Sequence, residues 1–235
     1  MIDVHSHIMF GIDDGSKSIE TSLEILEDAY NNGVTDIFLT PHYIEDSKYR
    51  CNNEDKEKIL KKLKYELKRK KIKLNLYIGN EIFINENILE YVKNKEIAPL
   101  NYSKYLLIEL PMGRMYNNTK SIFFELIRSG YTVILAHPER YRYMQDNDKM
   151  LEELLDMGVL LQGNYRSIFG YYGKDAKKAI KKFLKKKQIS FLGSDIHKND
   201  GYKLKKLEKK LLRLTKDKEY TNSILFGNAE KILKK

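Results

Sequence analysis

The chain has 235 residues, of which 42% are hydrophobic, and its formal net charge is +10. This apolar content excludes a disordered chain, and the single cysteine, Cys51, excludes an internal disulfide. No apolar run approaches the ~20 residues that a membrane-spanning helix needs, and the first predicted strand starts at residue 2. We therefore expect a protein without a signal peptide that is not embedded in a membrane and is located in the cytoplasm.

Short apolar or β-branched runs alternate with amphipathic segments along the whole chain, with no linker between them. The predicted strands are 2–7, 36–42, 74–83, 105–111, 131–139, 159–164 and 189–197. The predicted helices are 18–31, 54–71, 85–95, 119–129, 147–157, 175–187 and 203–216, and a short helix at 221–234 is expected to pack across one end. Glycines in "NNGV", "RSGY" and "DMGV" are typical of helix C-caps. This alternation predicts an α/β domain with a parallel sheet, closed as a barrel.

The stretch "VHSHIMFGIDDGS", which begins at residue 4, places two histidines on the first predicted strand. Because alternate residues of a strand share a face, His5 and His7 point the same way. Two imidazoles on one face suggest a pair of metal ligands, although a single buried histidine is more often a satisfied core residue. The pair by itself leaves both interpretations open.

All five histidines fall at or near the carboxyl end of a predicted strand, where other strands carry carboxylates. Active sites of α/β barrels form at this edge, because the loops that follow the strands converge there. With one acid from the "DDG" turn, the candidate metal ligands are His5, His7, Asp14, His42, Glu81, Glu109, His137, Asp195 and His197. This set suits two or three ions of Mn, Fe or Zn, and three ions would leave the pocket at about +2, which attracts phosphate. We expect Asp13 to form the turn.

Arg140, in "HPERYRY", follows His137 within one turn. A guanidinium at this position can hold phosphate oxygens and offset charge in the transition state. The alternative is a surface ion pair with Glu139 or another acid. Given the neighbouring ligands, we favour the phosphate role, and we favour Arg140 over Arg142.

The lysines concentrate in segments that also carry apolar residues at helical spacing, such as "DKEKILKKLKYELKRKKIK" and "YKLKKLEKKLLRL". Lysines on the opposite side of such helices usually form a solvated face. We therefore expect no specific nucleic-acid binding. Attraction of polyanions is the alternative.

Six motifs, "DVHSH…DDG", "TPHY", "GNEIF", "LIELP", "AHPERY" and "GSDIH", in this order, resemble the polymerase-and-histidinol-phosphatase (PHP) superfamily. Within it they are most similar to the bacterial manganese-dependent tyrosine-protein phosphatases associated with capsule and exopolysaccharide synthesis. The resemblance implies one domain over residues 1–235, a distorted (β/α)7 barrel, and three metal ions, Mn before Fe or Zn. It also implies that a metal-bound hydroxide attacks phosphotyrosine, and that the partner is an autophosphorylating bacterial tyrosine kinase with a tyrosine-rich tail.

The resemblance further implies how the ligands are grouped and where phosphate is held. The implied groups are His5, His7, Glu81 and Asp195 at one ion, a bridging Glu81 with Glu109 and His137 at the second, and Asp14, His42 and His197 at the third. The family pattern has a second arginine soon after the SDxH motif, where this chain has Tyr202 and Lys203. Either a lysine substitutes as a point charge, or Arg140 and the metals alone hold the phosphate.

Four other functions compete with this one. A cysteine-dependent phosphatase is excluded, because Glu57 stands where its arginine would follow Cys51 and acidic neighbours raise a thiol's pKa. An amidohydrolase is disfavoured, because Glu109 stands where that family typically has a lysine. A small-molecule phosphatase, such as one acting on histidinol phosphate, and a nucleic-acid-processing PHP phosphoesterase stay open. Four tyrosines line a phosphotyrosine slot or pack the barrel mouth: Tyr43, Tyr116, Tyr141 and Tyr165.

Overall fold

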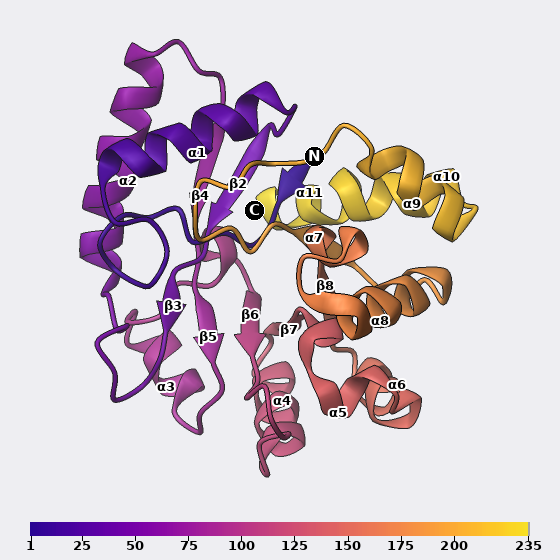
Figure 1. Cartoon of the computed structure of the whole chain (residues 1–235). Coiled ribbons are helices and arrows are strands. Elements are labelled where there is room, and N and C mark those ends of the chain that lie inside the picture. The colour runs from indigo at the N-terminus through magenta and orange to yellow at the C-terminus, as the bar shows by residue number, and fades with distance from the viewer. Residues whose placement is uncertain (235) are drawn as a thin grey trace.

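The computed structural model describes residues 1–234, and its centre is a curled set of parallel strands (Figure 1). The strands are β1 (Ile2–Asp3), β2 (Asp36–Leu39), β3 (His42–Tyr43), β4 (Asn75–Ile78), β5 (Glu81–Phe83), β6 (Tyr105–Glu109), β7 (Thr132–Ala136), β8 (Leu160–Asn164) and β9 (Phe191–Gly193). They form two sheets, in the orders β1-β2-β4 and β3-β5-β6-β7-β8-β9. Every pairing between neighbours in these sheets is parallel, as predicted.

Two of the predicted strands are each divided in two. The predicted strand 36–42 forms β2 and β3 on either side of Pro41, which has no N–H to donate to a ladder. The predicted strand 74–83 forms β4 and β5 on either side of Gly79. A Cβ at Gly79 would lie 2.6 Å from Cδ2 of Leu100 and 3.2 Å from Cγ2 of Thr40, so a larger residue at this break would displace buried side chains.

The breaks carry the chain from the first sheet to the second, and the ring of strands closes where β9 returns to β1. Beyond the breaks, His42 and Glu81 are register partners. At the closure, the N–H of Asp195 donates to the carbonyl of His5 at 2.9 Å, and the N–H of His7 donates to the carbonyl of Ile196 at 3.0 Å. The predicted distorted α/β barrel is therefore confirmed.

Helices cover the outside of the curled sheet (Figure 1). The α-helices are α1 (Ile19–Asn31), α2 (Asn53–Arg69), α3 (Ile88–Lys93), α4 (Thr119–Arg128), α5 (Arg142–Gln145), α6 (Asp148–Asp156), α7 (Tyr165–Phe169), α8 (Gly173–Lys185), α9 (Leu207–Thr215), α10 (Lys218–Asn222) and α11 (Asn228–Leu233). Short 3-10 turns form at Leu100–Tyr102 and Pro138–Arg140, and a π-helical turn forms at Ser223–Gly227. Within residues 1–234, no helix combines the length and the apolar character needed to cross a bilayer.

The predicted glycine C-caps are confirmed, because Gly33, Gly130 and Gly158 have φ values of 84°, 89° and 88°. The predicted helix 203–216 begins only at Leu207. Residues 203–206 form turns instead, in which the N–H of Leu204 donates to the carbonyl of Tyr202 at 2.6 Å and the N–H of Leu207 to the carbonyl of Leu204 at 2.8 Å.

The C-terminal helix packs across one end of the barrel, as predicted. Ala229 and Ile232 of α11 are buried in a cluster with Phe38, Leu107 and Phe191 from three strands. Each of these strand residues precedes a candidate metal ligand on its own segment by two to four positions. Helix α11 therefore closes the amino-terminal side of the barrel, and the candidate site lies at the carboxyl end.

Most lysines of the basic helices are exposed, as predicted for solvated faces, but Lys56 of α2 is an exception. Its side chain is fully buried, and Nζ donates a hydrogen bond to Oδ1 of Asn80. The same Oδ1 accepts from the N–H of Ala98 at 2.9 Å, and the Asn80 amide donates to the carbonyl of Pro41 at 3.0 Å. Through Asn80, which follows Gly79, Lys56 thus links α2 to both strand breaks.

Candidate metal centre

The predicted ligands form one polar cluster at the carboxyl ends of the strands. The imidazoles come from the segment after β1, from β3, and from the residues that follow β7 and β9, while the carboxylates come from β5, β6, the β1–α1 loop and the residues after β9. Each predicted ligand lies within 4.0 Å of another, from imidazole nitrogen to carboxylate oxygen. The residues brought together are His5, His7, Asp14, His42, Glu81, Glu109, His137, Asp195 and His197.

Glu81 lies at the middle of the cluster and is buried. Its Oε2 lies 3.3 Å from His5 Nε2 and 3.1 Å from both His7 Nε2 and His42 Nδ1. Its Oε1 lies 2.9 Å from Nε2 of His137. Both oxygens therefore face imidazole nitrogens, and they do so on different sides of the carboxylate.

His5 and His7 present their Nε2 atoms to a common point. The two nitrogens are 3.1 Å apart, and Oδ1 of Asp195 lies 3.7 and 3.5 Å from them. The Nδ1 atoms face acceptors, Oε1 of Gln162 at 2.8 Å from His5 and Oδ2 of Asp13 at 2.8 Å from His7. An acceptor at Nδ1 places the proton there, so the Nε2 lone pairs face the other ligands, as metal coordination requires.

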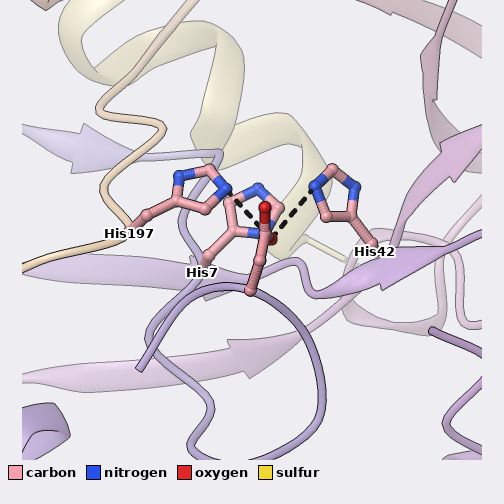
Figure 2. Close-up of side chains that lie close together, drawn as sticks. His7, His42 and His197 are labelled. Carbon is pink, nitrogen blue, oxygen red and sulfur yellow. Dashed lines mark ion pairs between the residues drawn. The ribbon is translucent and has the colours of Figure 1, made fainter. Parts of the chain in front are cut away.

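A further group gathers around Asp14 on the more exposed side. Oδ1 of Asp14 lies 3.5 Å from Nε2 of both His42 and His197. Figure 2 shows the rings of His7, His42 and His197 around one carboxylate, and the rings of His7 and His197 stack with centroids 3.9 Å apart. The side chain of Asp14 is 50% exposed, so this part of the cluster opens to solvent.

Glu109 and His137 complete the cluster on the opposite side. Oε1 of Glu109 lies 3.6 Å from Nε2 of His137, and its Oε2 lies 4.0 Å from Nδ1 of His42. His137 has φ of 31° and Asp195 has φ of 53°, both in the left-handed region. Such backbone conformations are costly for residues other than glycine and are concentrated at functional sites.

The charges of the cluster perturb one another strongly. Burial raises the pKa of Glu81, but the neighbouring imidazoles, His5 first, outweigh burial and hold this pKa well below its usual value. Burial, together with the charge of Glu81, raises the pKa of Glu109 well above its usual value. Burial lowers the pKa of His7, but Asp13 and Glu81 reverse this and raise the pKa well above its usual value. The crowded carboxylates repel one another unless positive charge lies among them. Bound divalent ions would supply this charge in place of protons.

Unpaired buried atoms test whether these residues fit a metal centre. Among residues 1–234, Oδ1 of Asp195 and Nδ1 of His42 are buried without a hydrogen-bond partner. Buried polar atoms are nearly always paired, and both of these atoms lie within 4.0 Å of other candidate ligand atoms. The donors are imidazole nitrogens and carboxylate oxygens, which suit Mn, Fe or Zn. The residues therefore fit a centre of divalent ions.

Three overlapping groups offer ligand atoms that all lie within 4.8 Å of one another. They are His7, Asp14, His42 and His197, then His5, His7 and Glu81, and finally His42, Glu81 and Glu109. His7 and His42 each belong to two of these groups. In the grouping that the resemblance implies, each of them belongs to one ion. The assignment of each ligand to a particular ion stays a prediction.

Asp13 has a larger role than the predicted turn. Its Oδ1 accepts from the N–H of Gly15 at 2.9 Å, which is the turn, and its Oδ2 accepts from the N–H of His42 at 3.1 Å as well as facing His7. Gln162 is absent from the residues predicted for the site. The available signal was a polar side chain inside the apolar run "VLLQGN".

Arg140 lies at the edge of the cluster and pairs with Asp195. Its Nη1 is 2.6 Å from Oδ2 of Asp195, which also accepts from the amide of Asn164 at 2.8 Å and the hydroxyl of Tyr172 at 3.0 Å. The guanidinium lies over the Tyr172 ring, 4.6 Å from its centroid. Arg140 thus forms an ion pair with an acid, as the alternative interpretation of its role expected. The acid is Asp195 and not Glu139. The side chain is 26% exposed, which leaves other guanidinium N–H groups accessible.

Three other candidates lie outside this cluster. They are Tyr202 and Lys203, as additional phosphate ligands, and Cys51, as a nucleophile. Tyr202 is buried, and its hydroxyl donates to Oδ2 of Asp3 at 2.7 Å, so it does not take the place of a second arginine. Lys203 is exposed and lines a cavity of about 230 Å³ together with Arg166. Burial raises the pKa of the Cys51 thiol, which agrees with the exclusion of thiolate chemistry.

The four tyrosines considered for a phosphotyrosine slot differ in exposure. Tyr43, Tyr141 and Tyr165 are fully buried and pack the barrel mouth. Tyr116 is half-buried and lines a rim cavity of about 450 Å³ together with Arg114. Tyr116 is therefore the member of this set that can contact a substrate.

A parallel α/β barrel with imidazoles and carboxylates clustered at its carboxyl edge defines a class of metal-dependent hydrolase. Over residues 1–234 the chain matches the family described as "Capsular polysaccharide synthesis, CpsB/CapC", and it belongs to this family. The resemblance to capsule-associated proteins found in the sequence is thereby confirmed.

Relatives of the chain agree with this assignment. It is 41% identical over 210 residues to a protein of Staphylococcus aureus named CapC, which covers 88% of this chain and 82% of the relative. It is 31% identical over 244 residues to the tyrosine-protein phosphatase CpsB of Streptococcus agalactiae, which covers 100% and 98%. A solved structure described as YwqE from Bacillus subtilis and CpsB from Streptococcus pneumoniae, "unique metal-dependent tyrosine phosphatases", superposes with a TM-score of 0.82 at 27% identity, covering 96% of both chains.

A histidinol phosphate phosphatase from Lactococcus lactis also shares the fold. Its TM-score is 0.60 at 16% identity, covering 92% of each chain. At this identity the likeness concerns the fold alone.

Proposed function

We propose that this chain is a metal-dependent tyrosine-protein phosphatase, a phosphoric monoester hydrolase that acts on phosphotyrosine in a protein. The observation that carries the proposal is the position of Glu81, whose two carboxylate oxygens lie 2.9–3.3 Å from four imidazole nitrogens at the barrel rim. The relatives named as tyrosine-protein phosphatases supply the substrate class.

In this proposal all nine clustered residues are metal ligands, and three divalent ions, Mn before Fe or Zn, occupy the site. Three ions carry +6 and the four carboxylates −4, so the pocket holds about +2 for a phosphate dianion. When bound, such ions supply Lewis acidity, because they lower the pKa of water and offset charge on phosphate oxygens.

The chain's own residues orient the ligands and hold the substrate. Asp13 and Gln162 keep the proton on Nδ1 of His7 and His5, so that Nε2 stays a lone-pair donor. Arg140 donates one N–H to Asp195, and its remaining N–H groups bind phosphate oxygens at the exposed edge. Burial of Glu81 and His137 excludes water from one side of the reacting group.

The proposed partner is a phosphotyrosine protein, in particular a bacterial tyrosine kinase of the capsule machinery, and the proposed compartment is the cytoplasm. The single domain over residues 1–235 is also part of the proposal. The family membership supports the link to capsule synthesis. Histidinol phosphate is the alternative substrate, and it rests on the likeness of folds alone.

The test is hydrolysis of a phosphotyrosine peptide and of histidinol phosphate side by side, after chelation and readdition of Mn²⁺. We expect faster turnover of the peptide, lost with the chelator and restored by the metal. Preference for histidinol phosphate would retain the metal centre but replace the substrate class. The Cys51→Ser variant is the control, and its loss of activity would reopen thiolate chemistry.

A further inference from the structure

A groove lined by positive charge lies along α9, where Phe169 of α7 approaches that helix. Helices α8 and α9 pack together on the outside of the barrel (Figure 1). The volume of the groove is about 660 Å³. The lining residues, here called the basic groove, are Phe169, Lys205, Lys206, Lys209, Lys210 and Arg213.

The cations of the basic groove are uncompensated. Among residues 1–234, none of its four lysines nor Arg213 forms an ion pair. On the other side of α8, by contrast, Lys182 and Lys186 pair with Asp148 at 2.6 and 2.9 Å. Nζ of Lys210 lies 4.4 Å from the centroid of the Phe169 ring, so an aromatic ring lines the groove beside its cations.

Charges from the facing helix add to this excess. Burial lowers the pKa of Lys210, and the neighbouring charges of Lys177 and Lys181 on α8 lower it further. Lysines of α8 therefore lie close to Lys210 of the basic groove and repel its charge. An anion between them would relieve this repulsion.

The basic groove is continuous with the rim of the metal centre. Phe169 also lines the cavity of about 230 Å³ that contains Arg166, Tyr171 and Lys203. Tyr172, which directly follows Tyr171 in the chain, donates its hydroxyl to Oδ2 of Asp195 at 3.0 Å. A chain that leaves the site beside Asp195 thus reaches the exposed Tyr171 and Lys203 first and the basic groove next.

We propose that the basic groove docks an acidic stretch of the phosphoprotein substrate, on one side of the phosphotyrosine that enters the metal centre. This inference rests on the proposed function. A concave site that combines cations with an aromatic ring, next to the cavity beside Tyr172 and Asp195, fits a polypeptide carrying Asp or Glu better than it fits a broad membrane surface. Exposed cations along α9 recur about every 5 Å, and alternate side chains of an extended peptide recur about every 7 Å. Because these spacings are similar, two or three carboxylates of the peptide can each lie near a cation of the groove.

The experiment compares the unaltered chain, loaded with Mn²⁺, with a triple variant Lys206→Glu, Lys209→Glu and Arg213→Glu. The substrates are a phosphotyrosine peptide with a flanking glutamate tract, the same peptide with glutamines, and para-nitrophenyl phosphate. For the glutamate peptide we expect KM to rise about tenfold with kcat unchanged, the scale of three exposed charge pairs. The other two substrates should be unaffected, and high salt should abolish the preference for glutamate.

A matched control carries the same change of charge on Lys64→Glu, Lys68→Glu and Lys71→Glu. These exposed lysines line a cavity of about 500 Å³ near Asn75, at the amino end of β4 and away from the rim. An equal rise of KM in the control would show that net charge alone matters and would overturn the proposal.

Binding measurements separate this inference from the proposed function. Anisotropy of a labelled, unphosphorylated glutamate peptide reports docking without turnover, and thermal melting reports whether each variant folds. Loss of binding in the groove variant alone supports docking, even if no phosphotyrosine substrate is hydrolysed and the proposed function fails. Unchanged peptide binding, or loss only of sedimentation with phosphatidylserine vesicles, overturns it.

Discussion

Asp195 holds the guanidinium of Arg140 on one carboxylate oxygen, at 2.6 Å, while its other oxygen faces the Nε2 atoms of His5 and His7 at 3.7 and 3.5 Å. The outer oxygen is thus saturated by donors from Arg140, Asn164 and Tyr172, and the inner oxygen is left without a partner among residues 1–234. One side chain therefore connects the proposed phosphate-binding arginine to the proposed metal ligands.

Replacing Arg140 with alanine should lower kcat/KM for para-nitrophenyl phosphate by about 100-fold, because one charged donor to the developing phosphate charge is lost. Metal content should stay near that of the unaltered chain, because Asn164 and Tyr172 still hold Asp195. Steady-state kinetics and elemental analysis measure both quantities. Arg142→Ala, at an exposed position close by, is the control, and unchanged kinetics in Arg140→Ala would remove this residue from the mechanism.

Replacing Glu81 with glutamine, or His7 with alanine, should abolish turnover and deplete bound metal. Glu81 faces four imidazoles through two oxygens, so an amide in its place loses both the charge and the ability to bridge cations. Elemental analysis and activity are measured on the same samples. Glu54→Gln, at an exposed carboxylate of α2 that pairs with Lys58, should leave both unchanged. Full metal content with full activity in Glu81→Gln would contradict the assigned centre.

Replacing Asp13 with asparagine should weaken Mn²⁺ affinity by about 10- to 100-fold with the fold intact, because the carboxylate that orients His7 becomes neutral. Titration calorimetry of the chelated protein measures the affinity. If affinity is unchanged, Asp13 serves the turn at Gly15 and nothing more.

Replacing Lys56 with methionine should change how stability depends on pH. Burial lowers the pKa of Lys56 to about 7, so between about pH 7 and 10 the unfolded chain binds more protons at this side chain than the folded chain does. Lys56 therefore makes the free energy of unfolding rise with pH in this range, and Lys56→Met should lose that slope. Urea unfolding at several pH values measures it. Parallel pH profiles for the two proteins would contradict a lowered pKa.

Metal binding should stabilise the protein more as pH rises. In the metal-free chain, the pKa of His7 is raised, so the stability from its pairing with Asp13 is fully present below about pH 6.5 and is lost as pH rises through the raised value. A metal requires the neutral imidazole, so metal-derived stability has the opposite dependence. The difference in Tm between Mn²⁺-loaded and chelated protein should therefore widen from pH 6 to pH 8. A constant difference would exclude competition between protons and metal at these ligands.

The amino-acid sequence by itself determined the barrel class and the membership of the cluster. Parallel strands direct all their carboxyl ends to one edge, so polar residues at strand ends must meet there whatever the details of packing. His5, Glu109 and His137 could be assigned to the site on that ground alone. The glycine C-caps and the final helix were predictable for the same local reasons.

Only the tertiary structure decided how these residues are oriented. The strand breaks at Pro41 and Gly79 bring His42 beside Glu81. The missing N–H of Pro41 is a local feature, but the packing of Gly79 against Leu100 and the bond from the buried Lys56 to Asn80 are long-range contacts that no local pattern encodes. The acceptors that set the imidazole tautomers come from elsewhere in the fold, since Gln162 lies 157 positions from His5. The pairing of Arg140 with Asp195 spans 55 positions. Such long-range hydrogen bonds follow from how the barrel closes, because closure brings distant strand ends within bonding distance.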